Sequence, residues 1–174
     1  KTLLFSTLTF SMAMTHYMEL LATNQPFNLI MYMAIPVICA ETIAITELYL
    51  LFTRNYSTWV KKLSTYVGIF TGIYFLGIFL NLFFTAFIPL TQSGEWRGIF
   101  DVVAVSFYLL GVIPLGGITL LELGLLKKKA DKEEKLKLHT IFVAIFLVVA
   151  HIAMIFGMLN PELLTGASTA PMNM

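Results

Sequence analysis

Long apolar runs alternate with short polar segments along this chain of 174 residues. Four of the runs cover about residues 27–52, 63–90, 101–126 and 138–159, and each contains 20 or more residues. A helix needs about 20 apolar residues to cross the ~30 Å hydrocarbon core of a bilayer. The pattern therefore predicts four transmembrane helices, the longer of which are expected to tilt.

A fifth apolar segment covers residue 2 to about residue 22 and is weaker than the others. It is rich in Ser and Thr and contains His16 and Glu19. Lys1 and the small residues around Met12 also fit the flanks of a signal peptide. We expect the segment to span, which predicts an all-α bundle of five transmembrane helices, or four if it is an interfacial helix.

Composition agrees with a membrane protein, since 58% of the residues are hydrophobic and only 12% are charged. Soluble domains have about twice that charged fraction. The whole chain, residues 1–174, is therefore predicted to be a single integral membrane domain. The single cysteine, Cys39, excludes an intrachain disulfide framework.

Basic residues gather in two alternate connections between the runs. Residues 53–62 hold three of them and residues 127–137 hold six lysines, whereas the opposite side has only Arg97. Positively charged loops stay in the cytoplasm. With five spans in a bacterial inner membrane, this rule predicts a cytoplasmic N-terminus and a periplasmic C-terminus.

Ionisable residues inside the apolar runs form two layers. Such residues are costly in lipid and by default mark function. Counting about 1.5 Å per residue from the inner end of each helix gives their depth. The outer layer holds His16, Glu19, Glu41 and His151, and the inner layer holds Glu47, Glu122 and His139.

The methionines share the outer half of the predicted membrane. None of the nine falls within positions 34–153. Helical spacing also produces two stripes, each on one helix face: Met12, His16 and Glu19 at i, i+4, i+7, and His151, Met154 and Met158 at i, i+3, i+7. At matched depth, the two stripes are expected to face one another across the bundle.

Imidazole and thioether are ligands that Cu(I) and haem iron prefer. The stripes thus predict a copper or haem b site with His16 and His151 as principal ligands and Met12, Met154 or Met158 as auxiliary ligands. Methionine as simple packing material is the alternative.

The carboxylates have several interpretations. Glu19 and Glu41 would tune the charge of the outer site or carry protons, and a neutral, hydrogen-bonded Glu41 is an equal alternative. Glu47, Glu122 and His139 would make a structural contact or form the inner half of a proton or ion path.

Proline and glycine predict the packing of the helices. Pro36 and Pro114 lie inside apolar runs and should kink their helices, freeing carbonyls that neighbours must satisfy. Small residues such as Gly68 and Gly72 permit close approach of two helices.

No Walker loop, dinucleotide fingerprint, HExxH, G-x-S-x-G or CxxCH motif is present, so no enzyme class is indicated. Nucleic-acid binding has no support either. The partners expected are the lipid bilayer and either further copies of the chain or a larger membrane complex.

HYMELLATNQPFNLIMYMAIP followed by ETIAITELYLLFTR resembles small bacterial inner-membrane proteins that are sometimes labelled permease-like. The resemblance covers mainly residues 15–54 and brings no established activity or site residue with it.

Three functions follow from these patterns. The first is electron transfer or metal handling at an outer metal or haem site. The second is permease-like transport of an ion, proton or small solute along the two polar layers. The third is a structural subunit of a membrane complex.

Overall fold

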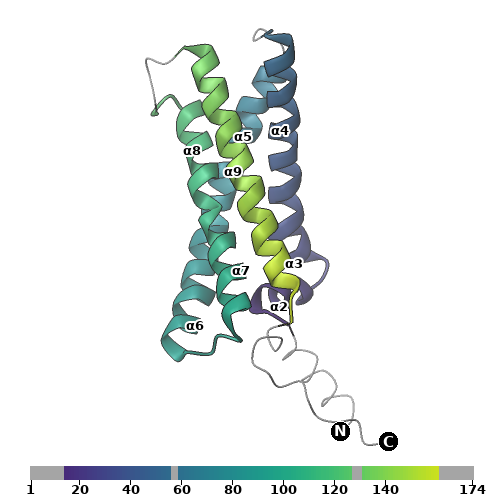
Figure 1. Ribbon diagram of the computed structural model, residues 1–174, viewed down its shortest axis with the longest axis vertical. Helices are drawn as coiled ribbons and strands as arrows, with labels where there is room; N and C mark the ends of the chain where they lie inside the picture. Colours follow the sequence, from purple (N-terminus) through teal and green to yellow (C-terminus); the bar gives the residue numbers. More distant parts are fainter. Residues whose placement is uncertain (1–13, 56–58, 127–130, 161–174) are drawn as a thin grey trace, which may run out of the picture.

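The computed structural model describes residues 14–55, 59–126 and 131–160. Every regular element among them is helical. Four segments are long and apolar enough to cross a membrane: Phe27–Thr53, Trp59–Ser93, Ile99–Glu122 and Lys132–Met158. They run alternately up and down and pack side by side as a bundle (Figure 1). The all-α membrane fold and the four stronger predicted spans are therefore confirmed.

Three of the four spans are interrupted helices. The first consists of α3 (Phe27–Leu29), the π-helical turn η1 (Ile30–Ala34) and α4 (Ile35–Thr53). The second consists of α5 (Trp59–Leu82), the π-helical turn η2 (Phe83–Phe87) and α6 (Ile88–Ser93). The third consists of α7 (Ile99–Leu110) and α8 (Val112–Glu122), and the fourth is the continuous helix α9 (Lys132–Met158).

The first apolar segment differs from the five-span prediction. Its described part forms only α2 (His16–Ala22), which begins after Thr15, a residue with extended backbone. The Thr15 hydroxyl accepts a hydrogen bond from the Met18 amide at 3.3 Å and donates one to the Gly157 carbonyl at 2.6 Å. Seven helical residues span only about 10 Å. The described residues therefore support the four-span alternative; residues 2–13 lie outside them.

The two ends of the bundle have different chemistry. We call the end with the α4–α5 and α8–α9 connections the basic end, because Arg54, Lys61, Lys62 and Lys132 lie there, and the other the α2 end (Figure 1). All described methionines lie in the elements of the α2 end: Met14, Met18, Met31, Met33, Met154 and Met158.

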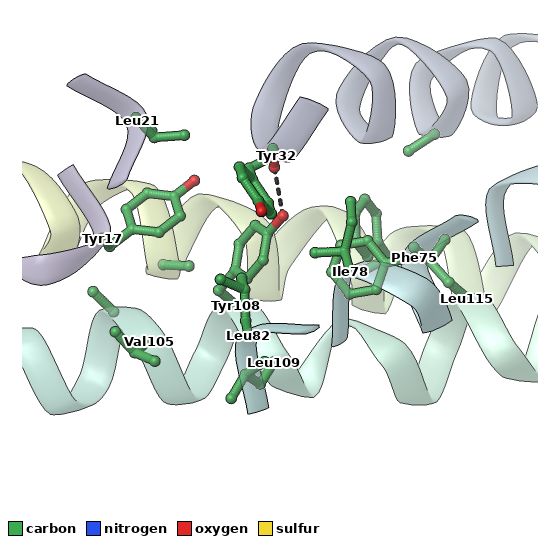
Figure 2. Packing of buried hydrophobic residues seen from close by; sticks show 14 of the residues in the cluster. Tyr17, Leu21, Tyr32, Phe75, Ile78, Leu82, Val105, Tyr108, Leu109 and Leu115 are labelled. Atoms are coloured by element: carbon green, nitrogen blue, oxygen red, sulfur yellow. Dashed lines mark hydrogen bonds between the residues drawn. The ribbon is translucent and has the colours of Figure 1, made fainter. Parts of the chain in front are cut away.

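Two tyrosine hydroxyls donate hydrogen bonds to backbone carbonyls that Pro36 leaves without a donor. Because Pro36 has no N–H, neither the Tyr32 carbonyl (its α-helical acceptor) nor the Met31 carbonyl (its π-helical acceptor) receives a bond from it. Tyr108 Oη donates to the Tyr32 carbonyl at 2.5 Å (Figure 2), and Tyr74 Oη donates to the Met31 carbonyl at 2.9 Å. Neighbouring spans therefore supply the missing donors beside Pro36, as expected.

Pro114 also lies next to an interruption, two spans later, since α7 ends at Leu110 and α8 begins at Val112. The bundle core extends past these interruptions, and Ile43, Phe75 and Ile118 are among its almost completely buried residues. Large apolar side chains such as Ile113 face outward and are exposed to lipid when the bundle is in a membrane.

Candidate metal site at the basic end of the bundle

Glu47 is a buried carboxylate in the last third of α4, with 1% of its surface exposed. The Ser64 hydroxyl on α5 donates a hydrogen bond of 2.5 Å to Glu47 Oε1. His139 Nδ1 on α9 lies 2.8 Å from the same oxygen. Three helices therefore hold this carboxylate away from lipid.

Glu122, the last residue of α8, approaches the same imidazole from its other side. Its Oε1 lies 3.6 Å from His139 Nε2 and 2.7 Å from Lys61 Nζ. The Thr65 hydroxyl donates to its Oε2 at 2.9 Å. Glu122 is thus fixed by α5 and faces His139 across a gap.

Three buried polar atoms of this site have no hydrogen-bond partner: Glu47 Oε2, His139 Nδ1 and His139 Nε2. His139 Nδ1 is close to Glu47 Oε1, but its N–H is not aligned with that oxygen. Leaving a buried polar atom unsatisfied costs about 1–3 kcal/mol. In native proteins such atoms commonly bind an ordered water molecule or an ion.

The three side chains meet within a small volume around the His139 imidazole. One ligand atom from each of Glu47, Glu122 and His139 lies within 4.8 Å of the others, and no other group of three or more His, Cys, Asp or Glu side chains does so in the described part of the chain. Two ligands of a tetrahedral zinc ion, each at about 2.1 Å, lie about 3.4 Å apart. The 3.6 Å gap between Glu122 Oε1 and His139 Nε2 is close to that value.

Gly68 makes room for this convergence. A Cβ atom there would lie 3.1 Å from Ile118 Cγ2 and 3.5 Å from His139 Nε2. Glycine thus lets the backbone of α5 approach α8 and the imidazole closely.

A cavity of about 230 Å³, which we call the basic-end cavity, adjoins the site. Its lining includes Glu122, His139, Lys61, Lys132 and Lys135. Since a water molecule occupies about 30 Å³ in the liquid, this space holds several waters or a hydrated ion.

The structure places the predicted outer residues in different surroundings. His16, at the start of α2, binds the buried Asp101 twice: its backbone N–H donates to Asp101 Oδ1 at 2.7 Å, and its Nδ1 lies 2.5 Å from Oδ2. The amide of Arg97 also donates to Asp101, at 3.3 Å. Asp101 therefore ties α2 to the beginning of α7.

Arg97 strengthens the same attachment, because its guanidinium binds the Met14 carbonyl at 2.7 Å and pairs with Glu19. Tyr17 of α2 is buried. This burial raises the pKa of its phenol to about 12, so the phenol stays neutral. Glu19 thus has a structural partner, and His16 faces a cavity of about 350 Å³ at the α2 end.

His151 and Glu41 lie in a separate, smaller cavity between α4 and α9, the midspan cavity. His151 Nδ1 lies 2.6 Å from the Leu147 carbonyl of its own helix. Met154 lines this cavity as well, whereas Met158 is 66% exposed.

The two predicted layers have different outcomes. Glu47, Glu122 and His139 lie close together at the basic end, and their role as a site stays a prediction. His16 and His151 line separate cavities, so the structure gives the paired outer site no support, and Met12 lies outside the described residues. α2 begins at His16, after the extended Thr15. Ligation by the outer residues stays a prediction.

The transport prediction requires one path past Glu41 and Glu122. These two carboxylates line different cavities, and the almost completely buried Ile43 and Ile118 occupy the core. A path for ions therefore needs a rearrangement of the bundle, and transport stays a prediction.

Sequence reasoning overlooked Asp101, Lys61, Ser64 and Thr65. Lys61, Ser64, Thr65 and Gly68 follow i, i+3, i+4, i+7, so their spacing already places them on one face of α5. In the sequence Asp101 marks only the boundary of an apolar run, although an acidic residue in a first helical turn often binds backbone amides.

A family model described as a family of unknown function, DUF6803, matches residues 12–173. The chain therefore belongs to this family. No curated protein and no solved structure matches the chain significantly.

Proposed function

We propose that this member of the DUF6803 family binds a divalent transition-metal ion with Glu47, Glu122 and His139 and acts in metal handling in the membrane. One observation carries the proposal: ligand atoms from three helices lie within 4.8 Å of one another, and Glu47 Oε2 and both ring nitrogens of His139 are buried without a hydrogen-bond partner.

The donor set narrows the choice of metal. Carboxylate and imidazole ligands suit Zn²⁺, Mn²⁺ and Fe²⁺, whereas Cu(I) prefers thiolate and thioether sulfur. Three protein ligands leave a coordination position open, as in sites that exchange ligands. We therefore favour an exchangeable zinc, iron or manganese ion over copper or haem.

The position of the site supports exchange with the cytoplasm. Positively charged connections mark the cytoplasmic side, so the basic end faces inward in this proposal. The basic-end cavity connects to Glu122 and His139 at that end. An ion would enter from the cytoplasm rather than cross the apolar core.

Metal analysis of the purified protein tests the proposal. The parent chain, prepared from metal-replete cells, is expected to carry about one zinc, iron or manganese ion per chain. His139→Ala and Glu47→Gln are expected to weaken zinc binding at least a hundredfold, because each removes a ligand of the ion.

Glu133→Gln is a matched control at the same end, since Glu133 is an exposed residue paired with Lys137 at 3.1 Å. It should bind metal like the parent, as should His16→Ala and His151→Ala. Unchanged metal content in His139→Ala would overturn the proposal, and loss of metal in His16→Ala or His151→Ala would favour the outer site instead.

Lys61 competes with the metal for Glu122. Its ammonium lies 2.7 Å from Glu122 Oε1, one of the ligand atoms available to an ion. Lys61→Met removes a positive charge beside the cation site, so we expect zinc to bind about tenfold more tightly or better. Titration of the metal-free protein measures this affinity. Lys62→Met, at the exposed neighbouring lysine, should leave it unchanged, and equal or weaker binding in Lys61→Met would contradict the role given to Lys61.

A further inference from the structure

The midspan cavity has features that the metal site does not use. It lies between α4 and α9, and its lining combines Glu41 and His151 with aromatic residues such as Tyr32, Phe75 and Tyr108. Figure 2 shows these three rings gathered in the core beside the first span. The cavity is therefore aromatic on one side and carries two hydrogen-bonding groups.

Glu41 is a polar group without a visible partner. It lies near the middle of the span Phe27–Thr53, on the surface of the bundle, and no hydrogen bond or ion pair to another described residue engages its carboxyl group. Lipid offers no hydrogen bonds at that depth, so an unsatisfied carboxyl group there is costly. A ligand that reaches this position from the membrane would supply the missing partner.

His151 offers a second hydrogen-bonding atom. Its Nδ1 is engaged by the Leu147 carbonyl at 2.6 Å, so its Nε2 is the atom left for a ligand. The bond to Leu147 also fixes the orientation of the ring. Glu41 on α4 and His151 on α9 thus present polar atoms to one cavity from two different helices.

The volume of the cavity limits the ligand. It measures about 110 Å³, whereas a cavity of about 150 Å³ is known to hold one benzene ring. A porphyrin is several times larger than one ring, so this cavity does not fit a haem. This volume is smaller than the space that holds one benzene ring, so a single-ring head group would lie partly inside the cavity and partly at its open rim, where Glu41 and His151 are exposed.

We propose that the midspan cavity binds the head group of a quinone or quinol from the membrane. The two hydroxyls of a quinol lie on opposite sides of its ring and would donate to His151 Nε2 on α9 and to the Glu41 carboxylate on α4; a quinone, whose oxygens only accept, would bind there when these two groups are protonated. Its flat faces suit packing against tyrosine and phenylalanine. Its isoprenoid tail would remain among the lipids, toward which the exposed Glu41 opens.

Direct binding in quinone-free lipid nanodiscs tests this proposal, with a short-chain ubiquinone and its reduced quinol as probes. The parent chain is expected to bind one of them saturably, with one molecule per chain. His151→Ala and Glu41→Gln are expected to raise the dissociation constant at least tenfold. Ala150→Phe, which fills the cavity but keeps both polar groups, should abolish binding.

Two controls separate this site from a folding defect and from the metal site. Met158→Leu changes an exposed residue of the same helix and should bind quinone like the parent. His139→Ala should lose metal yet keep quinone. Each variant is checked by its unfolding midpoint, which for the cavity variants should stay within a few degrees of the parent.

Three results would overturn the proposal. One is quinone uptake that rises linearly and equally in all variants, which is simple partitioning into lipid. Another is equal saturable binding in folded His151→Ala and Glu41→Gln. The last is displacement of the quinone by ordinary phospholipid at equal concentration, which would make the cavity a lipid site. None of these outcomes depends on metal binding at the basic end.

Discussion

Gly72→Ala is expected to lower the free energy of unfolding by at least about 3 kcal/mol, the upper part of the usual range for overpacking. A Cβ atom at Gly72 would lie 1.7 Å from Thr119 Oγ1 and 2.8 Å from the Leu115 carbonyl oxygen. The threonine side chain can rotate away, but the backbone carbonyl can move only with α8. The substitution should therefore push α5 and α8 apart.

Gly77→Ala provides a matched control on the same helix. No atom lies within 4 Å of a Cβ at Gly77, so the change should be neutral or slightly stabilising, since alanine favours helix more than glycine does. Thermal or denaturant unfolding of both variants in one detergent measures the difference. Equal stability of Gly72→Ala and Gly77→Ala would show that α5 and α8 are not in close contact at Gly72.

Gly72→Ala should also affect the metal site. Thr65 and Lys61 of α5 hold Glu122 of α8, so separating the two helices moves Glu122 away from His139. We expect Gly72→Ala to weaken zinc binding even where it folds. This effect would link helix packing to the proposed function.

Asp101→Ala is expected to lower the free energy of unfolding by about 3 kcal/mol and to release α2 from the bundle. Asp101 is completely buried and accepts bonds from the His16 amide, the His16 ring and the Arg97 amide. Removing one member of a buried hydrogen-bonded network leaves its partners without hydrogen bonds. Breaking a buried ion pair in this way lowers the free energy of unfolding by about 3–5 kcal/mol. Limited proteolysis should then cut within α2.

Glu95→Gln is the control for Asp101→Ala. Glu95 is exposed and lines the cavity of the α2 end, so its neutralisation should change stability by less than about 0.5 kcal/mol. If Asp101→Ala leaves both the unfolding free energy and the protease resistance of α2 unchanged, Asp101 does not hold α2 on the bundle.

The first segment illustrates why composition overestimates the number of spans. It is apolar enough for a weak span, yet Thr15 caps a new helix and binds the Gly157 carbonyl of α9. A capping hydroxyl is visible in the sequence, but its distant acceptor is not, because 142 residues separate the two. Only the folded bundle decides between a helix that crosses and one that lies at its end.

The predicted pairing of His16 with His151 failed to gain support for a related reason. Depth estimates assume that each helix is continuous and straight from the inner surface. α2 is a short separate helix, so the assumption does not hold for His16. The ring of His16 instead binds the buried Asp101, which lies 85 residues away in the sequence. Matching depth along a sequence therefore does not show that two side chains share a site.

The sequence by itself determined the all-α membrane fold, the four long spans, the charged end and the layer that contains Glu47, Glu122 and His139. Those features depend on the length of apolar runs and on the spacing of polar residues, both of which a helix of fixed rise converts directly into position.

Tertiary structure alone decided that one ligand atom from each of these three residues converges within 4.8 Å while Glu41 and His151 border a different cavity. Convergence depends on the rotation and separation of three helices, which Gly68 and Gly72 set through contacts with residues far away in the chain.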